Sequence, residues 1–221
     1  MKNINFLKEN LIAHRGLHSS NAVENTLKAF IRAIEKKYII ELDIHILKDD
    51  VIVVYHDFDL KRLTGVNKVI ENFSYPQLLK IKVKNKYQIP TLEQVMNIVN
   101  NQVPLLIEVK TMFNNIHFFA ELSKLLDSYK GRVAIQSINP YVIDWFYENK
   151  KKYPIGLIIF NDINYKMFKK YVKKIDFISV YKRSLPFKSN KMIIGWTIKN
   201  MSELKKYKNI SDNLIVENIL I

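Results

Sequence analysis

Four of the five histidines and a pair of acidic residues lie between residues 11 and 57. An apolar run ends at His14, a second carries Glu41 and Asp43 on alternate positions, and a third ends at His56. Acid–base groups placed at the ends of apolar segments are typical of a solvent-accessible catalytic basin, because a hydrophobic core excludes such groups unless they are paired. We therefore expect the active site to be built from this part of the chain.

The acidic pair indicates a metal site. Glu41, Asp43 and His45 alternate with apolar residues, so the period of two in a β-strand places all three on one face. Adjacent buried carboxylates repel each other and lose hydration, so they need a cation or raised pKa values. Glu108 ends a later apolar run and offers a third carboxylate. The alternative is an acid pair on an exposed edge strand, but the flanking isoleucines argue against it.

The expected metal is one hard divalent cation. The sequence contains no cysteine, which excludes thiolate-bound metal and disulfides. Carboxylate oxygens completed by water suit Mg2+ or Ca2+ better than zinc, which prefers nitrogen and sulfur ligands.

His14 and His56 are the candidates for acid–base catalysis. One imidazole can remove a proton from a nucleophile while the other donates a proton to a leaving group. Arg15 and Lys110 would add two fixed positive charges, an arrangement that suits a phosphate group. Lys110 could instead be one more surface lysine, but it follows Glu108 by two residues and so shares its face. His18 and His117 are expected to be structural or surface residues. His45 is an intermediate case, for which we expect a position lining the barrel.

Short apolar runs alternate with amphipathic runs along the chain, which predicts β/α units around a parallel sheet. The expected strands are residues 10–13, 39–45, 105–109, 132–136, 155–160, 177–180, 192–196 and 214–217. The expected helices are residues 24–36, 91–100, 115–128, 140–150, 164–173 and 202–207. Residues 181–191 contain Pro186 and are too short and broken for a full helix, and the chain stops soon after the eighth strand. We therefore expect an incomplete outer ring of helices.

Residues 51–55 are expected to form an extra short strand that returns across the polar turn at residues 47–50 as a hairpin. Eight strands with helices between them predict a single TIM-type (β/α)8 barrel domain spanning residues 1–221. Polar residues cluster where the predicted strands end, which in such a barrel is the catalytic face. These residues are His14-Arg15, Glu108 and Lys110, Gln136-Ser137, Asn161-Asp162, Trp196-Thr197 and Glu217-Asn218.

The net charge of +14 is spread along the whole length. Such a charge can attract an anionic partner, or it can be a solvated lysine-rich surface. No basic motif with interleaved aromatic residues accompanies it, so we expect no nucleic-acid partner. The sequence has no apolar run long enough for a signal peptide or a membrane span, and we expect a cytoplasmic location.

An ordered set of motifs resembles the glycerophosphodiester phosphodiesterase family, and the resemblance runs from about residue 12 to residue 217. The motifs are His14-Arg15-Gly16, Glu24-Asn25-Thr26 with Ala29-Phe30, Glu41-x-Asp43, Lys48-Asp49, His56-Asp57 with Leu60-x-Arg62-x-Thr64, Ile89-Pro90-Thr91-Leu92, Glu108-x-Lys110, Gln136-Ser137 and Trp196-Thr197. The chain departs from the family pattern at Asp50, Ile138 and Val216-Glu217-Asn218, so no role is carried over to Glu217 or Asn218.

The resemblance implies a barrel enzyme that cleaves glycerophosphodiesters to an alcohol and glycerol 3-phosphate with Mg2+ or Ca2+. It implies that Trp196 lines the glycerol pocket and that a cyclic phosphate forms when the glycerol 2-hydroxyl attacks the phosphorus. By the same resemblance, Glu41, Asp43 and Glu108 match the residues that bind the metal in the family. His14 and His56 match its acid–base catalysts, and Arg15 and Lys110 match the residues that bind the phosphate.

Two alternatives remain open at the level of the sequence. A lysophospholipase D working at a membrane is favoured by the loop at residues 111–114 and by the positive charge. An inactive barrel that only binds phosphorylated ligands is disfavoured, because a binding module has no need of two histidines beside a carboxylate cluster. Peripheral membrane contact and a homo-oligomer, whose second subunit would close the barrel, are further expectations.

Overall fold

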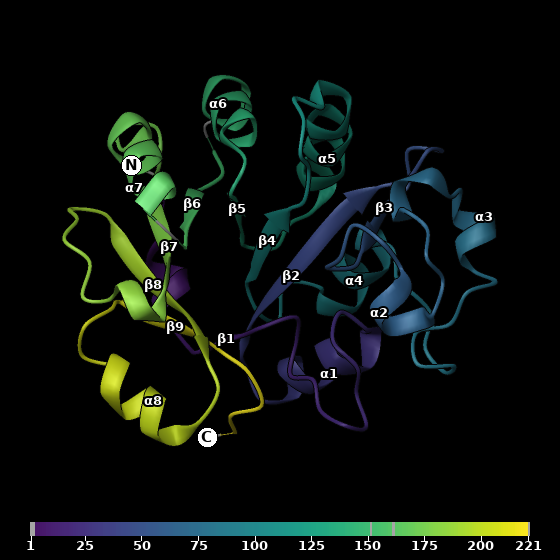
Figure 1. Ribbon diagram of the computed structural model, residues 1–221, viewed down its shortest axis with the longest axis horizontal. Helices are drawn as coiled ribbons and strands as arrows, with labels where there is room; N and C mark the ends of the chain where they lie inside the picture. Colours follow the sequence, from purple (N-terminus) through teal and green to yellow (C-terminus); the bar gives the residue numbers. More distant parts are fainter. Residues whose placement is uncertain (1–2, 151, 161, 221) are drawn as a thin grey trace.

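The computed structural model describes residues 3–150, 152–160 and 162–220, in which eight parallel strands close into a barrel (Figure 1). The ring runs β1-β2-β4-β5-β6-β7-β8-β9 and closes through β1, which pairs with both β2 and β9. The bounds are β1 (Ile12–Ala13), β2 (Ile39–Ile46), β4 (Leu105–Val109), β5 (Val133–Ser137), β6 (Ile155–Ile159), β7 (Phe177–Tyr181), β8 (Met192–Ile198) and β9 (Asn213–Val216). The predicted TIM-type barrel is therefore confirmed.

Helices surround the barrel, and side-chain caps set where several of them begin. They are α1 (Leu27–Glu35), α4 (Leu92–Val99), α5 (Ile116–Ser128), α6 (Pro140–Asn149), α7 (Asp162–Tyr171) and α8 (Met201–Tyr207). Thr91 and Gln94 form a reciprocal capping box at α4, and Asn139 caps α6 just before a first-turn proline. In the described part of the chain no helix is long and apolar enough to cross a membrane.

The structure corrects several predicted boundaries. The first helix begins at Leu27 and not at residue 24, because the Thr26 hydroxyl accepts a hydrogen bond from the Ala29 amide and so caps the helix. The last helix begins at Met201, capped by Asn200, one residue before the predicted start. The first strand is shorter than predicted, and β8 continues two residues past Trp196.

The predicted hairpin and the gap in the helix ring are both present. Strand β3 (Ile52–Val54) pairs antiparallel with β2 outside the ring. Between β7 and β8 the chain forms only the 3-10 turn η3 (Lys182–Ser184). The segment between β3 and α4 adds α2 (Lys61–Thr64), η2 (Ile70–Asn72) and α3 (Tyr75–Leu78), short elements that the sequence analysis did not predict. They pack with β3 around a small hydrophobic cluster of their own.

The lower half of the barrel is filled by one inward-facing apolar side chain from most strands. This cluster joins Phe6 and Leu7 of η1 (Asn5–Lys8) to Ile12, Ile39, Leu106, Ala134, Phe177, Ile194 and Ile215. Strand β6 contributes Gly156, where a Cβ atom would lie 2.1 Å from the Phe177 ring, so the glycine leaves room for this side chain. Because strand side chains alternate, the residue two positions further along each strand also faces inward. Those residues build the site.

Candidate active site

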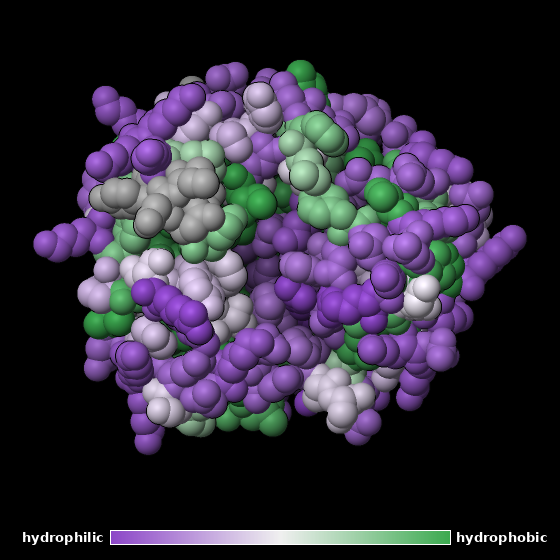
Figure 2. Space-filling view, in the orientation of Figure 1, coloured by the Kyte–Doolittle hydropathy of each residue, from purple (hydrophilic) through white to green (hydrophobic). Residues whose placement is uncertain are grey.

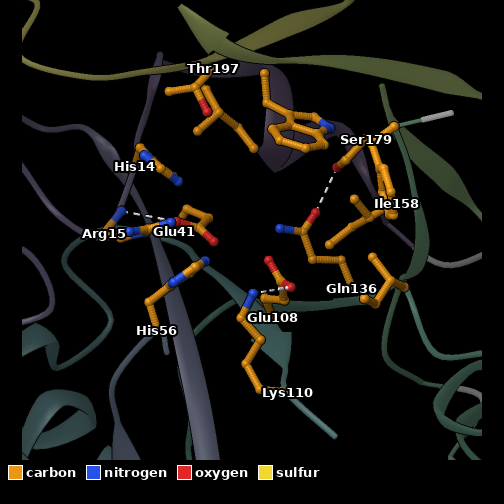
Figure 3. Close-up of a pocket in the computed structure, with 14 residues that line it drawn as sticks. His14, Arg15, Glu41, His56, Glu108, Lys110, Gln136, Ile158, Ser179 and Thr197 are labelled. Atoms are coloured by element: carbon orange, nitrogen blue, oxygen red, sulfur yellow. Dashed lines mark hydrogen bonds and ion pairs between the residues drawn. The ribbon is translucent and has the colours of Figure 1, made fainter. Parts of the chain in front are cut away.

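A hollow opens at the carboxyl ends of the barrel strands (Figure 2), directly above the apolar filling. Two positions after each inward-facing apolar residue, the next inward-facing residue is polar: His14 follows Ile12, Glu41 follows Ile39 and Glu108 follows Leu106. The same step leads from Ala134 to Gln136, from Phe177 to Ser179 and from Ile194 to Trp196. Other lining residues are Arg15, His56, Lys110, Ile138, Ile158, Phe160, Thr197 and Ile215 (Figure 3). The inward-facing side chains of these strands therefore change from apolar to mostly polar over two residues.

Three carboxylates meet on neighbouring strands. Asp43 of β2 is the register partner of Glu108 of β4, and Glu41 lies two residues before Asp43 on the same face. One oxygen from each lies within 4.8 Å of the others. Burial, together with the charges of Asp43 and Glu108, raises the pKa of Glu41 well above its ordinary value. Burial raises the pKa of Glu108 as well. The cluster therefore holds more negative charge than its surroundings stabilise.

Arg15 and Lys110 compensate part of this charge. Lys110 Nζ lies 2.6 Å from Glu108 Oε1 and 3.2 Å from Asp43 Oδ1. The Arg15 backbone amide donates to Glu41 Oε2 at 2.9 Å, and its Nε lies 3.4 Å from Asp43 Oδ2. Burial acts to raise the pKa of Asp43, but the positive charges, Lys110 first, hold it below its ordinary value. Two cations facing three carboxylates leave one negative charge for a further cation.

The donor set fits the expected metal ion. All three ligand candidates are carboxylates, and the side chain of Asp43 is only 1% exposed. An oxygen-only set of this kind suits Mg2+ or Ca2+, and the raised pKa values of Glu41 and Glu108 are the expected mark of a cluster built for a cation.

His14 and His56 approach the cluster from opposite edges and each has a carboxylate partner. His56 Nδ1 lies 2.6 Å from Asp57 Oδ1, and His14 Nδ1 lies 3.4 Å from Glu217 Oε2. An ionised carboxylate only accepts hydrogen bonds, so the proton on His56 sits on Nδ1, which leaves Nε2 for the pocket (Figure 3). Burial lowers the pKa of both histidines. Both rings are therefore neutral near pH 7, as a base requires.

A chain of ion pairs fixes His56 relative to the cluster. Asp57 accepts a hydrogen bond from Arg62 Nε at 2.6 Å, and Arg62 in turn contacts Glu24 at 2.7 Å. Glu24 also accepts from Arg15 NH1 at 2.7 Å. Burial acts to raise the pKa of Glu24, yet its hydrogen bonds from Arg62 and the charge of Arg15 lower it to about 2. The network joins the strand ends of β1 and β3 through the α2 insertion.

The opposite wall of the pocket is apolar and carries two polar anchors. Ile138, Ile158 and Phe160 line it. The Ser179 hydroxyl donates to the side-chain oxygen Oε1 of Gln136 at 2.6 Å, so the side-chain nitrogen of Gln136 points into the pocket (Figure 3).

All eight predicted site residues line or border this pocket: His14, Arg15, Glu41, Asp43, His56, Glu108, Lys110 and Trp196. His117 is a surface residue paired with Asp50. The ring of His45 is buried and contacts Glu71 and Phe58. The position of Asn161 lies outside the described residues.

The sequence analysis missed some polar contacts of the site. Asn25 donates to Asp43 at 2.9 Å, and Glu217 faces His14, although no role was assigned to it. The sequence analysis placed Glu217 on the catalytic face, at the end of the last strand, but did not predict its contact with His14. His18 was expected to have no such setting, but it lies beside His14 and Glu217.

Two histidines, two fixed cations and a carboxylate cluster at the carboxyl-terminal mouth of a (β/α)8 barrel define a barrel enzyme acting on phosphate esters. The family model of the glycerophosphoryl diester phosphodiesterase family matches residues 14–193. The chain belongs to this family and is a phosphoric diester hydrolase.

Individual relatives agree with this assignment. The chain is 27% identical to a Bacillus subtilis protein named as putative glycerophosphodiester phosphodiesterase YhdW, over 93% of each chain. It is 32% identical to lysophospholipase D GDPD1 of Mus musculus, over 65% of this chain and 50% of that protein. Its fold is similar to that of a phosphodiesterase of Oleispira antarctica solved with the product sn-glycerol-3-phosphate, with a TM-score of 0.82, 18% identity, and coverage of 95% of this chain and 93% of that one.

Proposed function

We propose that this enzyme hydrolyses glycerophosphodiesters, such as glycerophosphocholine or glycerophosphoethanolamine, to glycerol 3-phosphate and an alcohol. The observation that carries the proposal is the placement of two neutral histidines on either side of a carboxylate cluster flanked by Arg15 and Lys110. Glu41, Asp43 and Glu108 would hold Mg2+ or Ca2+. When bound, such an ion polarises the phosphoryl oxygen and stabilises negative charge.

The proton transfers follow from the two imidazoles. His14 takes the proton of the glycerol 2-hydroxyl as its oxygen bonds to phosphorus, and His56 gives a proton to the alkoxide as its bond to phosphorus breaks. The phosphate charge favours the protonated form of His56. A cyclic phosphate remains, water opens it, and the two histidines exchange roles. Arg15 and Lys110 hold the phosphate oxygens, and Trp196 lines the glycerol side.

The proposal is tested by measuring release of glycerol 3-phosphate from glycerophosphocholine after EDTA treatment, and again after addition of Mg2+ or Ca2+. A His14→Ala variant serves as the inactive control. We expect release that depends on the cation and is lost in the variant. Folded protein that releases no glycerol 3-phosphate with either cation would refute the assignment.

A second candidate, lysophospholipase D activity at a membrane, is favoured by the surface beside the pocket. Met112 and Phe113 on the loop after β4 are 70% and 77% exposed, and Ile116 at the start of α5 is 57% exposed. Figure 2 shows apolar side chains beside the central hollow in this region. Ile138 and Phe160 belong to the apolar pocket wall, and Asn139, next to Ile138, donates hydrogen bonds to the backbone carbonyls of Thr111 and Phe113. A single acyl chain could lie along this path, and the net charge of +14 favours an anionic surface.

This candidate has its own test. Wild type and a Met112→Ser/Phe113→Ser variant are sedimented with vesicles containing anionic lipid, and both are assayed with lysophosphatidylcholine. We expect weaker sedimentation and slower turnover of the lysolipid in the variant, with unchanged turnover of glycerophosphocholine. Equal sedimentation of the two proteins would argue for a surface that plays no part in catalysis. In either case we propose that the protein acts in the cytoplasm.

A further inference from the structure

A second group of metal-ligating side chains lies at the ends of β1 and β9. One ring nitrogen each of His14 and His18, and one carboxylate oxygen of Glu217, lie within 4.8 Å of one another. The two strands are hydrogen-bonded neighbours in the barrel, so the residues just past them are brought together. The group borders a cavity that Glu24 and Lys199 also line, and that adjoins the reaction pocket through shared residues such as His14 and Trp196. None of the three carboxylates of the acidic cluster lines this cavity.

The two imidazoles of this group remain available to a ligand, whereas Glu217 also pairs with Lys199. His14 Nδ1 is buried without a hydrogen-bond partner, although Glu217 Oε2 lies 3.4 Å away. Leaving a buried polar nitrogen unpaired costs about 1–3 kcal/mol. Within the described residues, no hydrogen bond or ion pair involves the ring of His18. The orphaned nitrogen therefore needs a partner, and it faces a carboxylate and a second imidazole.

We propose that His14, His18 and Glu217 bind a transition-metal ion of the zinc type, at a site separate from the acidic cluster. Two imidazole nitrogens and one carboxylate oxygen, completed by water, form a ligand set typical of Zn2+. The acidic cluster offers oxygen only and selects a harder ion. The chain thus separates two metals by ligand chemistry within one barrel mouth.

Occupation of this site inhibits the reaction. A neutral imidazole carries one proton, so a metal ion on Nδ1 of His14 keeps that proton on Nε2. The ring points into the reaction pocket (Figure 3), and Nε2 then has no lone pair to accept a proton from substrate. This inhibition, unlike the binding, rests on the proposed function.

Lys199 sets the strength of the site. Its Nζ lies 3.6 Å from Glu217 Oε2, so it competes with a metal ion for the carboxylate, and its side chain is 61% exposed and free to swing away. Replacing Lys199 removes a competing positive charge next to the ion. The Lys199→Gln variant is therefore expected to bind the ion more tightly than wild type.

Binding is tested without any activity assay. The full chain, saturated with Mg2+, is titrated with Co2+, whose four-coordinate complexes with nitrogen ligands absorb visible light strongly while its octahedral oxygen complexes absorb weakly. We expect a strong band, an affinity at least ~10-fold lower in His18→Gln, and a higher affinity in Lys199→Gln. The control is His117→Gln, the same substitution at a surface histidine, which should match wild type. A weak band, or equal affinity in all four proteins, would overturn the site.

Inhibition is tested in a second experiment with glycerophosphocholine and Zn2+. Wild type should lose activity in a way that excess Mg2+ does not relieve, and His18→Gln should keep its rate under the same conditions. Equal inhibition of both proteins overturns the proposed inhibition. A strong Co2+ band in a protein without hydrolytic activity would support the metal site and refute the proposed function, so the two failures are distinguishable.

Discussion

Each charged side chain in the site contacts groups of opposite charge, and Lys110 is the clearest example. Its ammonium group bridges Glu108 and Asp43 with a side chain that is only 13% exposed. Burial acts to lower the pKa of Lys110, yet the charges of Asp43 and Glu108 raise it above its ordinary value. The lysine therefore remains charged and compensates part of the negative charge of the carboxylate cluster.

The Lys110→Met variant is expected to destabilise the metal-free protein by about 3 kcal/mol, because it leaves buried carboxylates uncompensated. Saturating Mg2+ or Ca2+ should recover part of this loss, since the ion replaces the missing charge. Urea denaturation in EDTA and in each cation measures both effects. Lys199→Met is the matched control on an exposed lysine and should stay within about 0.5 kcal/mol of wild type. A metal-free Lys110→Met protein as stable as wild type would contradict this account.

Asp57 orients His56 and is itself held by Arg62. Burial acts to raise the pKa of Asp57, but its hydrogen bonds from Arg62 and His56 lower it, so the carboxylate stays ionised. The Asp57→Asn variant can no longer enforce the Nδ1–H tautomer, and we expect kcat to fall about 10²-fold with KM nearly unchanged. Steady-state kinetics with glycerophosphocholine measures this split. Asp59→Asn is the control, and an unaltered kcat in Asp57→Asn would exclude an orienting role.

At the scale of elements, the site depends on strands that keep their inward-facing side chains in layers. The lower layer is apolar, and Gly156 of β6 is the position that lets the ring of Phe177 from β7 fill the centre. The layer above it carries Ser179, two residues after Phe177 on the same strand. The packing of the apolar layer therefore fixes the positions of the polar side chains in the layer above it.

The Gly156→Ala variant should cost about 1–3 kcal/mol of stability, because the new methyl group overlaps the Phe177 ring and the core has no space to give. The double variant Gly156→Ala/Phe177→Leu should recover part of this loss. Thermal denaturation measures both variants. Additive losses in the double variant would show that the two positions do not compete for the same space.

At the scale of the whole molecule, Glu24 joins segments far apart in the chain. It accepts hydrogen bonds from Arg15 at the end of β1 and from Arg62 of α2. Its side chain is 15% exposed, so the pairing is sheltered from solvent. The ionised carboxylate therefore holds the α2 insertion against the barrel mouth.

The pH dependence of stability should reveal this link. Because the pKa of Glu24 is about 2 in the folded protein against an ordinary 4.5, its stabilising effect is complete above pH 4.5 and is lost as the pH falls through about 2. The free-energy difference between wild type and Glu24→Gln should thus be constant above pH 4.5 and shrink below it. Urea denaturation in EDTA over this range measures the difference. A difference in unfolding free energy that stays constant at all pH values would rule out the ion pairs of Glu24 as its source.

The sequence by itself determined the barrel class, the order of the strands and the residues expected to line the site. Alternation over a few residues placed Glu41 and Asp43 on one face, and the predicted helix starts at residues 91 and 140 lie within one residue of the observed starts, because these are local effects of backbone geometry. The family's ordered motifs added Trp196. The helix start at residue 24 was wrong because Thr26 competes locally as a cap.

Only the tertiary structure decided which side chains meet. Glu217 reaches His14 because β9 closes the barrel against β1, and Glu24 reaches Arg62 because the α2 insertion folds back over the mouth. Such pairings join segments far apart in sequence, and no periodicity within either segment encodes them. The physical reason is that register between distant strands is set by packing of the whole barrel, while strand and helix formation depends on near neighbours.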